Sequence, residues 1–153
     1  MTVRVQAQDF DIGAELEKLS VGNHQVGGVA SFVGLVRDIA PMGSGGSASM
    51  TLEHYPGMTE KRLIEIEAEA QRRWPLAATL IIHRYGRLEP GDRIVLVATA
   101  SSHREAALES CAFLIDWLKT EAPFWKLEDG PEGARWVEAK SSDDARKAAW
   151  EKK

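Results

Sequence analysis

The segment from residue 93 to residue 123 limits the possible folds more than any other part of the chain. Residues 93–100 are nearly all apolar or β-branched, which predicts a strong strand. The pattern then becomes helical, because Ser102 and Glu105 have the spacing of a capping box and Pro123 ends the helix. The apolar stripe of this helix is predicted to contain Leu108, Cys111, Ala112, Ile115 and Leu118. A helix with such a stripe must bury it against another element of the fold.

The other elements complete an α+β pattern. Further strands are predicted over residues 3–7, 29–37, 50–55, 79–85 and 134–140, and further helices over residues 11–20 and 59–74. Asp11 and Thr59 are the expected N-caps of these two helices. The order of elements predicts helices packed on an antiparallel or mixed sheet.

The connecting segments suggest one domain over residues 1–153. A Gly/Ser-rich stretch at 39–49 is expected to be a flexible loop. The strands on either side of it are expected to pair as one long antiparallel hairpin. A charged tail at 141–153 is expected to be mostly helical and to fray.

Composition argues against several classes of protein. No run approaches the roughly 20 apolar residues that span a bilayer, and the N-terminus has no apolar signal region, so we expect a cytoplasmic protein without membrane contact. The net charge of −4 argues against a nucleic-acid binder but allows a local basic pocket. One cysteine, Cys111, rules out an internal disulfide. A small buried thiol and a nucleophile both remain open for it.

Five cationic side chains are candidates for binding or chemistry. His103 and Arg104 lie in the first turn of the predicted helix, where free backbone amides favour an anion. Lys119 lies at the edge of the apolar stripe, where it can extend to solvent or, if desolvated in a pocket, act as a base or nucleophile. Lys126 follows in extended backbone, and Arg37 ends a strand, where a surface salt bridge is the alternative to a ligand contact.

Other functional patterns are absent from the sequence. His54 and His83 lie on predicted strands among apolar neighbours, which favours structural roles. No histidines or carboxylates have metal-ligand spacing, and no nucleophile elbow occurs. The residues alone therefore predict a cationic pocket for an anionic small molecule, with lysine chemistry possible. A non-catalytic module that senses a phosphorylated metabolite, and a nucleic-acid-binding fold, remain as alternatives.

Three blocks of sequence carry a resemblance to a known family. They are Thr51-Leu-Glu-His-Tyr-Pro-Gly-Met-Thr-Glu-Lys61, Ser102-His-Arg104 and Leu118-Lys-Thr-Glu-Ala-Pro-Phe-Trp-Lys126. Together with Arg135-Trp-Val-Glu138, they closely resemble the large, catalytic subunit family of molybdopterin synthase. The similarity covers roughly residues 27–140.

The resemblance implies a fold, a reaction and partners. The implied fold is an α/β hammerhead-type sandwich with an additional antiparallel sheet. The implied enzyme is a sulfurtransferase that converts cyclic pyranopterin monophosphate (precursor Z) into molybdopterin, without a metal or other cofactor. The sulfur comes from a thiocarboxylate on the C-terminal Gly-Gly of a small ubiquitin-like carrier subunit, and the catalytic subunits form a homodimer within a heterotetramer.

The resemblance also assigns roles to the cationic residues. Lys119 resembles the family's active-site lysine beside the thiocarboxylate, and Lys126 resembles its second essential lysine. Arg37, His103 and Arg104 match basic residues around the substrate phosphate and pterin. Lys140 stands where many relatives have an arginine that enters the partner protomer's site, so it keeps the charge but loses the bidentate fork. Phe32 and Met58 are further candidates for pocket walls.

Overall fold

The computed structural model describes residues 2–38, 49–130, 133–137 and 141–151. These residues form eight strands and four helices. The strands are β1 (Val3–Gln6), β2 (Gly28–Leu35), β3 (Ser49–His54), β4 (Leu76–Arg84), β5 (Gly86–Leu88), β6 (Arg93–Ser101), β7 (Phe124–Gly130) and β8 (Gly133–Val137). The helices are α1 (Ile12–Lys18), α2 (Met58–Arg73), α3 (Arg104–Glu121) and α4 (Ser141–Glu151). The α+β class predicted from the sequence is confirmed.

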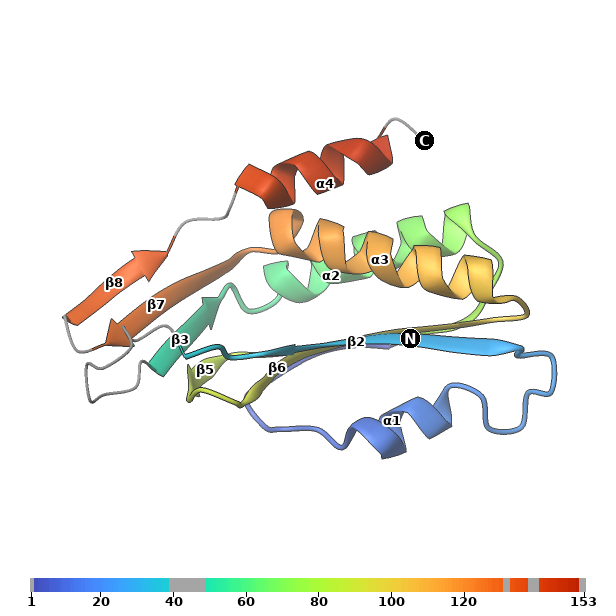
Figure 1. Ribbon diagram of the computed structural model, residues 1–153, viewed down its shortest axis with the longest axis horizontal. Coiled ribbons are helices and arrows are strands. Elements are labelled where there is room, and N and C mark those ends of the chain that lie inside the picture. Colours follow the sequence, from blue (N-terminus) through green and yellow to red (C-terminus); the bar gives the residue numbers. More distant parts are fainter. Residues whose placement is uncertain (1, 39–48, 131–132, 138–140, 152–153) are drawn as a thin grey trace.

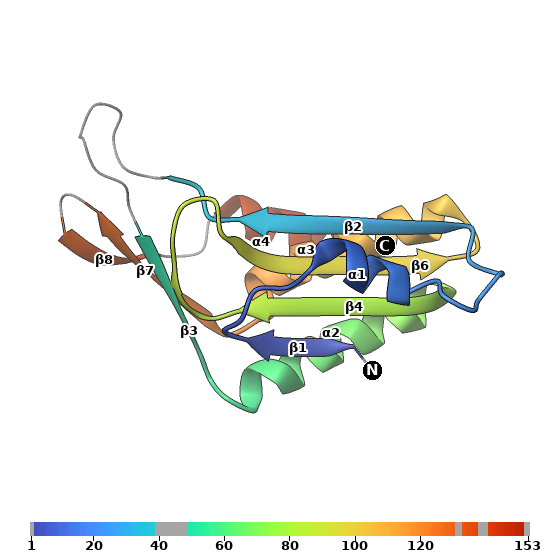
Figure 2. The same ribbon diagram turned by 90° about the horizontal axis from the view of Figure 1, so that it is seen from below.

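The strands form two sheets. The first sheet has the order β1-β4-β6-β2, with β1 parallel to β4 and the other pairs antiparallel. The second has the order β5-β3-β7-β8 and is antiparallel throughout. Helices α2 and α3 cover one face of the first sheet and α1 covers the other, while β3, β7 and β8 extend beyond one end (Figures 1 and 2). The additional antiparallel sheet is therefore present, as expected.

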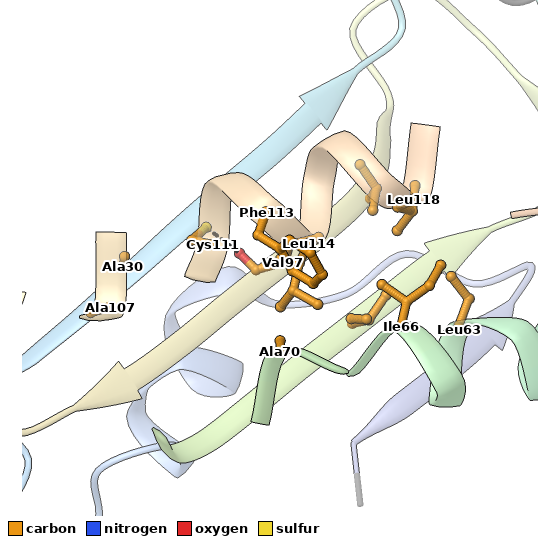
Figure 3. Close-up of a cluster of buried hydrophobic side chains, with 12 residues drawn as sticks. Ala30, Leu63, Ile66, Ala70, Val97, Ala107, Cys111, Phe113, Leu114 and Leu118 are labelled. Atoms are coloured by element: carbon orange, nitrogen blue, oxygen red, sulfur yellow. Dashed lines mark hydrogen bonds between the residues drawn. The ribbon is translucent and has the colours of Figure 1, made fainter. Parts of the chain in front are cut away.

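The main core lies between the first sheet and helices α2 and α3 (Figure 3). Helix α2 contributes Leu63, Ile66 and Ala70, which are fully buried. The stripe of α3 is instead formed by Ala107, Cys111, Leu114 and Leu118, with Phe113 beside it. The prediction for Leu108 is wrong, because this side chain is 61% exposed. Burial of the α3 face stabilises the layer by about 25 cal/mol for each Å² of apolar surface removed from water.

The predicted hairpin between residues 29–37 and 50–55 is wrong. Strand β2 pairs with β6, and β3 pairs with β5 and β7 in the other sheet. Each of these strands finds its apolar neighbours in a different core, so proximity in sequence does not decide the pairing. Residues 39–48 of the predicted loop lie outside the described residues.

Two predicted helix caps are also wrong. The N-cap of α3 is His103 rather than Ser102, and no side chain caps this helix. Helix α2 begins after Gly57, whose φ of 85° favours glycine, and the Glu60 carboxylate accepts a hydrogen bond from the Gly57 amide at 2.6 Å. The Asp11 cap of α1 is confirmed by its 2.9 Å hydrogen bond from the Ala14 amide.

The charged tail forms helix α4, as expected, and this helix packs on α3. The indole of Trp150 donates a 2.8 Å hydrogen bond to Asp116, and its ring contacts Phe113 and Trp74 edge to face. The carbonyl of Trp150 accepts a hydrogen bond from Arg73 at 3.1 Å. One apolar ring thus anchors a helix whose other residues are charged or small. In the described part of the chain, no helix is both long and apolar enough to cross a membrane.

A buried carboxylate joins α2 to the edge of the first sheet. Glu67 is 3% exposed and accepts hydrogen bonds from the hydroxyls of Thr2 at 2.6 Å and Thr79 at 2.8 Å. We expect Glu67→Ala to lower the free energy of unfolding by about 1–3 kcal/mol, because the buried donor of Thr79 loses its acceptor. Urea denaturation would measure this. Glu65→Ala, an exposed change on the same helix, should cost less than about 1 kcal/mol, and equal losses would contradict the prediction.

Candidate active site

The junction between α3 and β7 brings Lys119 and Lys126 to the same region. Lys119 lies in the last turn of α3, and Pro123 ends the helix so that β7 begins at Phe124. In the antiparallel pairing of β3 with β7, Phe124 lies opposite His54 and Lys126 lies opposite Leu52. Directly opposed residues point to the same side of a sheet. Since Leu52 is 1% exposed, the side chain of Lys126 leaves the backbone on the inward face of the second sheet.

His83 of β4 lies close enough to both lysines for their charges to act on its ring. Its ring stacks on Phe124 with a centroid distance of 3.7 Å and an interplanar angle of 18°. Its Nδ1 donates a 2.9 Å hydrogen bond to the carbonyl of Arg84, because a carbonyl oxygen can only accept. Burial, together with the positive charges of Lys119 and Lys126, lowers the pKa of His83 to about 3. The two lysine charges therefore act on one neutral, buried imidazole.

Aromatic rings continue this surface beyond His83. His54 lies 4.3 Å from the ring of Tyr85 and 6.4 Å from that of Phe124. On the other face of the second sheet, Tyr55 and Trp125 meet edge to face at 4.1 Å and are partly exposed. The lysines thus stand beside an aromatic layer that limits access of water on one side.

Contacts from two other helices fix the junction. The Thr59 hydroxyl donates to the carbonyl of Pro123 at 3.1 Å and accepts from the Tyr55 amide at 3.1 Å. Glu121, the last residue of α3, accepts a 2.6 Å hydrogen bond from Arg62 of α2 and pairs with Lys147 of α4. These cations lower the pKa of the Glu121 carboxyl. Thr59 therefore serves this junction and not the helix cap predicted for it.

His103 and Arg104 lie at the opposite end of α3 from the lysines. The helix separates Arg104 from Lys119 by about 22 Å. Both His103 and Arg104 are exposed, and the start of β2 lies against them, since a Cβ on Gly28 would approach the Arg104 Cα to 3.8 Å. Within one copy of the chain, the predicted cationic set is therefore divided between two ends of the molecule.

Arg37 belongs to the lysine end. It follows β2, whose far end pairs with the start of β6, and α3 runs back over the sheet to this end (Figures 1 and 2). Its side chain is exposed. Phe32, also on β2, and Met58, at the start of α2, are 41% and 65% exposed. Lys140 lies outside the described residues.

Cys111 is a core thiol. It is 6% exposed, its sulfur lies 3.8 Å from the carbonyl of Val97, and burial raises its pKa to about 11. This favours the buried thiol over the nucleophile. Among the described residues, no three His, Cys, Asp or Glu side chains gather closely enough to hold a metal ion.

The contact between His83 and Phe124 was not predicted from the sequence. His83 and Phe124 come from segments 41 residues apart, and their contact depends on how the two sheets meet. One signal was available: on the predicted strand 79–85, His83 falls on the same face as Ile81, which is fully buried. A histidine on a buried face is constrained by its neighbours, but the pattern does not identify them.

Comparisons with known proteins agree with this geometry. The family model described as MoaE protein matches residues 5–121. The chain is 56% identical to a molybdopterin synthase catalytic subunit of Ralstonia nicotianae over 97% of this chain and 84% of the relative. It is 54% identical to that of Pseudomonas aeruginosa over 99% of each. The solved structure of a molybdopterin biosynthesis MoaE protein from Burkholderia ambifaria has a TM-score of 0.81 and 54% identity, covering 98% of both chains.

Proposed function

The chain belongs to the MoaE family of molybdopterin synthase catalytic subunits, and from this premise we propose that it transfers sulfur to cyclic pyranopterin monophosphate. The donor is the C-terminal thiocarboxylate of a small carrier subunit, and the product is the dithiolene of molybdopterin. The observation that carries the proposal is the convergence of Lys119 and Lys126 on the buried His83–Phe124 pair. A cytoplasmic location is part of the same proposal.

The lysines suit the chemistry of the carrier tail. When sulfur leaves the carrier, water must add to its terminal acyl carbon, and the carrier ends as a carboxylate. Negative charge develops on the acyl oxygen in this step, and an ammonium group can stabilise it and supply or take up a proton. We assign this role to Lys119, with Lys126 as the second catalytic residue. Arg37 can bind the substrate phosphate through two parallel hydrogen bonds.

His103 and Arg104 are proposed to reach this site from a second copy of the chain. Strand β2 is an edge of the first sheet and exposes the apolar side chains of Val29, Phe32 and Leu35. Exposed apolar edges favour pairing with another strand. Two-fold antiparallel pairing of two β2 strands would place the start of one beside the end of the other, so that His103 and Arg104 of a second copy approach Arg37 and Lys119.

Reconstitution tests the proposed function. Purified protein, thiocarboxylated carrier and cyclic pyranopterin monophosphate should give molybdopterin, measured by fluorescence of its oxidised derivative. Carrier with an ordinary C-terminal carboxylate should give none, because it has no sulfur to transfer. A module that only senses the phosphorylated compound would bind it without converting it. Binding without product from the thiocarboxylated carrier would contradict the proposal.

A further inference from the structure

The spacing of the two lysines depends on one short stretch of backbone. Lys119 is on a helix and Lys126 is on a strand, and Phe124 lies between them at the start of β7. A change in the path of residues 120–125 would move one lysine relative to the other. Within this stretch, Ala122 and Phe124 pack against the main core, and the ring of Phe124 stacks on His83 of the first sheet.

We infer that His83 is a positioning residue for the lysine pair, which it controls by holding the ring of Phe124 against the first sheet. This inference rests on the proposed function. The stack needs a flat ring at position 83, and the Nδ1 hydrogen bond to the Arg84 carbonyl fixes the plane of that ring. His83 makes no contact with substrate in this role.

The imidazole also has to stay uncharged. A charged ring at this buried point would add a third positive charge near Lys119 and Lys126, with His54 as a further neighbour. Burial and these cations keep the pKa of His83 near 3, so the ring is neutral throughout the range in which the enzyme works. A neutral ring can lie near two ammonium groups without repelling either.

Three variants separate positioning from general stability. His83→Ala removes the stack and should lower kcat about 10-fold or more, with KM for the carrier and the pterin changed less than about threefold, because a displaced lysine affects the transition state more than binding. His83→Phe keeps a flat ring and should recover kcat to within about threefold of wild type. Thr79→Ala, a buried polar change on the same strand, should lower the melting temperature without lowering kcat.

A second measurement needs no substrate. The ring resonances of His83 should not titrate between about pH 8 and pH 5, whereas an ordinary histidine does. The pKa of His83 is lower in the folded state than in the unfolded state, so the unfolded state takes up a proton at a higher pH. The free energy of unfolding therefore decreases as the pH falls from about 6.5 towards 3. His83→Phe lacks this proton uptake, so its melting temperature should fall less with acid than that of wild type.

The outcomes are distinguishable. If wild type makes no molybdopterin, the proposed function fails, while the titration of His83 still tests the neutral ring. If wild type is active and His83→Ala keeps its kcat, or loses no more than Thr79→Ala, the positioning role is overturned. It is also overturned if folded His83→Phe is as inactive as His83→Ala. Should His83→Ala not fold, Phe124→Leu removes the same stack and should show the same fall in kcat.

Discussion

Replacement of Lys119 by alanine should abolish most of the sulfur transfer. We expect kcat to fall by about 100-fold or more, the usual loss when one group that stabilises a developing oxyanion is removed. The KM for the carrier should change much less, since the rest of the docking surface remains. The side chain is exposed at the last turn of α3, so the fold should be retained. Initial rates of molybdopterin formation with thiocarboxylated carrier measure the effect.

Two further variants show what the lysine contributes. Lys119→Arg keeps the positive charge but holds its proton far more tightly, so a partial recovery of kcat would indicate electrostatic stabilisation and no recovery would indicate proton transfer. Lys18→Ala, on α1 across the sheet, is the matched control, because its side chain is 68% exposed and only pairs with Glu15. Full activity of Lys119→Ala would remove the lysine from the mechanism.

Local patterns were sufficient for most elements of the fold. The run at 93–100 and the helix after it correspond to β6 and α3, and Pro123 separates α3 from β7 as expected. The motif around Lys119 and Lys126 identified the family, which the comparisons confirm over residues 5–121. These features depend on neighbours within a few residues, so periodicity and breaker residues are enough to locate them.

The pairing and register of the strands could not be predicted from such local patterns. Strand β2 finds β6 about 60 residues later in the chain, and the sequence between them gives no sign of it. The error at Leu108 has a similar origin, since several rotations of α3 bury a comparable apolar stripe. The same limit applies to the site. Helical spacing put His103 and Lys119 on one element, and the length of that helix places them about 22 Å apart in one copy.

Mixed dimers provide a strong test of the site shared between two copies. The double variant His103→Ala, Arg104→Ala should be nearly inactive, because the substrate anion loses two cationic partners, and Lys119→Ala should be nearly inactive for the reason given above. A dimer with one copy of each has one site in which Lys119 and the partner's His103 and Arg104 are all intact. Such dimers should regain about half of the wild-type activity, since one of two sites is complete.

Co-expression with two different affinity tags and purification on both isolates these mixed dimers. The controls are dimers in which both tagged copies carry the same variant. These dimers should stay inactive, which excludes an effect of the tags. If His103, Arg104 and Lys119 acted within one copy, each site of the mixed dimer would contain a defect and no activity would return. The two ends of α3 lie roughly 22 Å apart, and for this reason we expect activity to return in the mixed dimer.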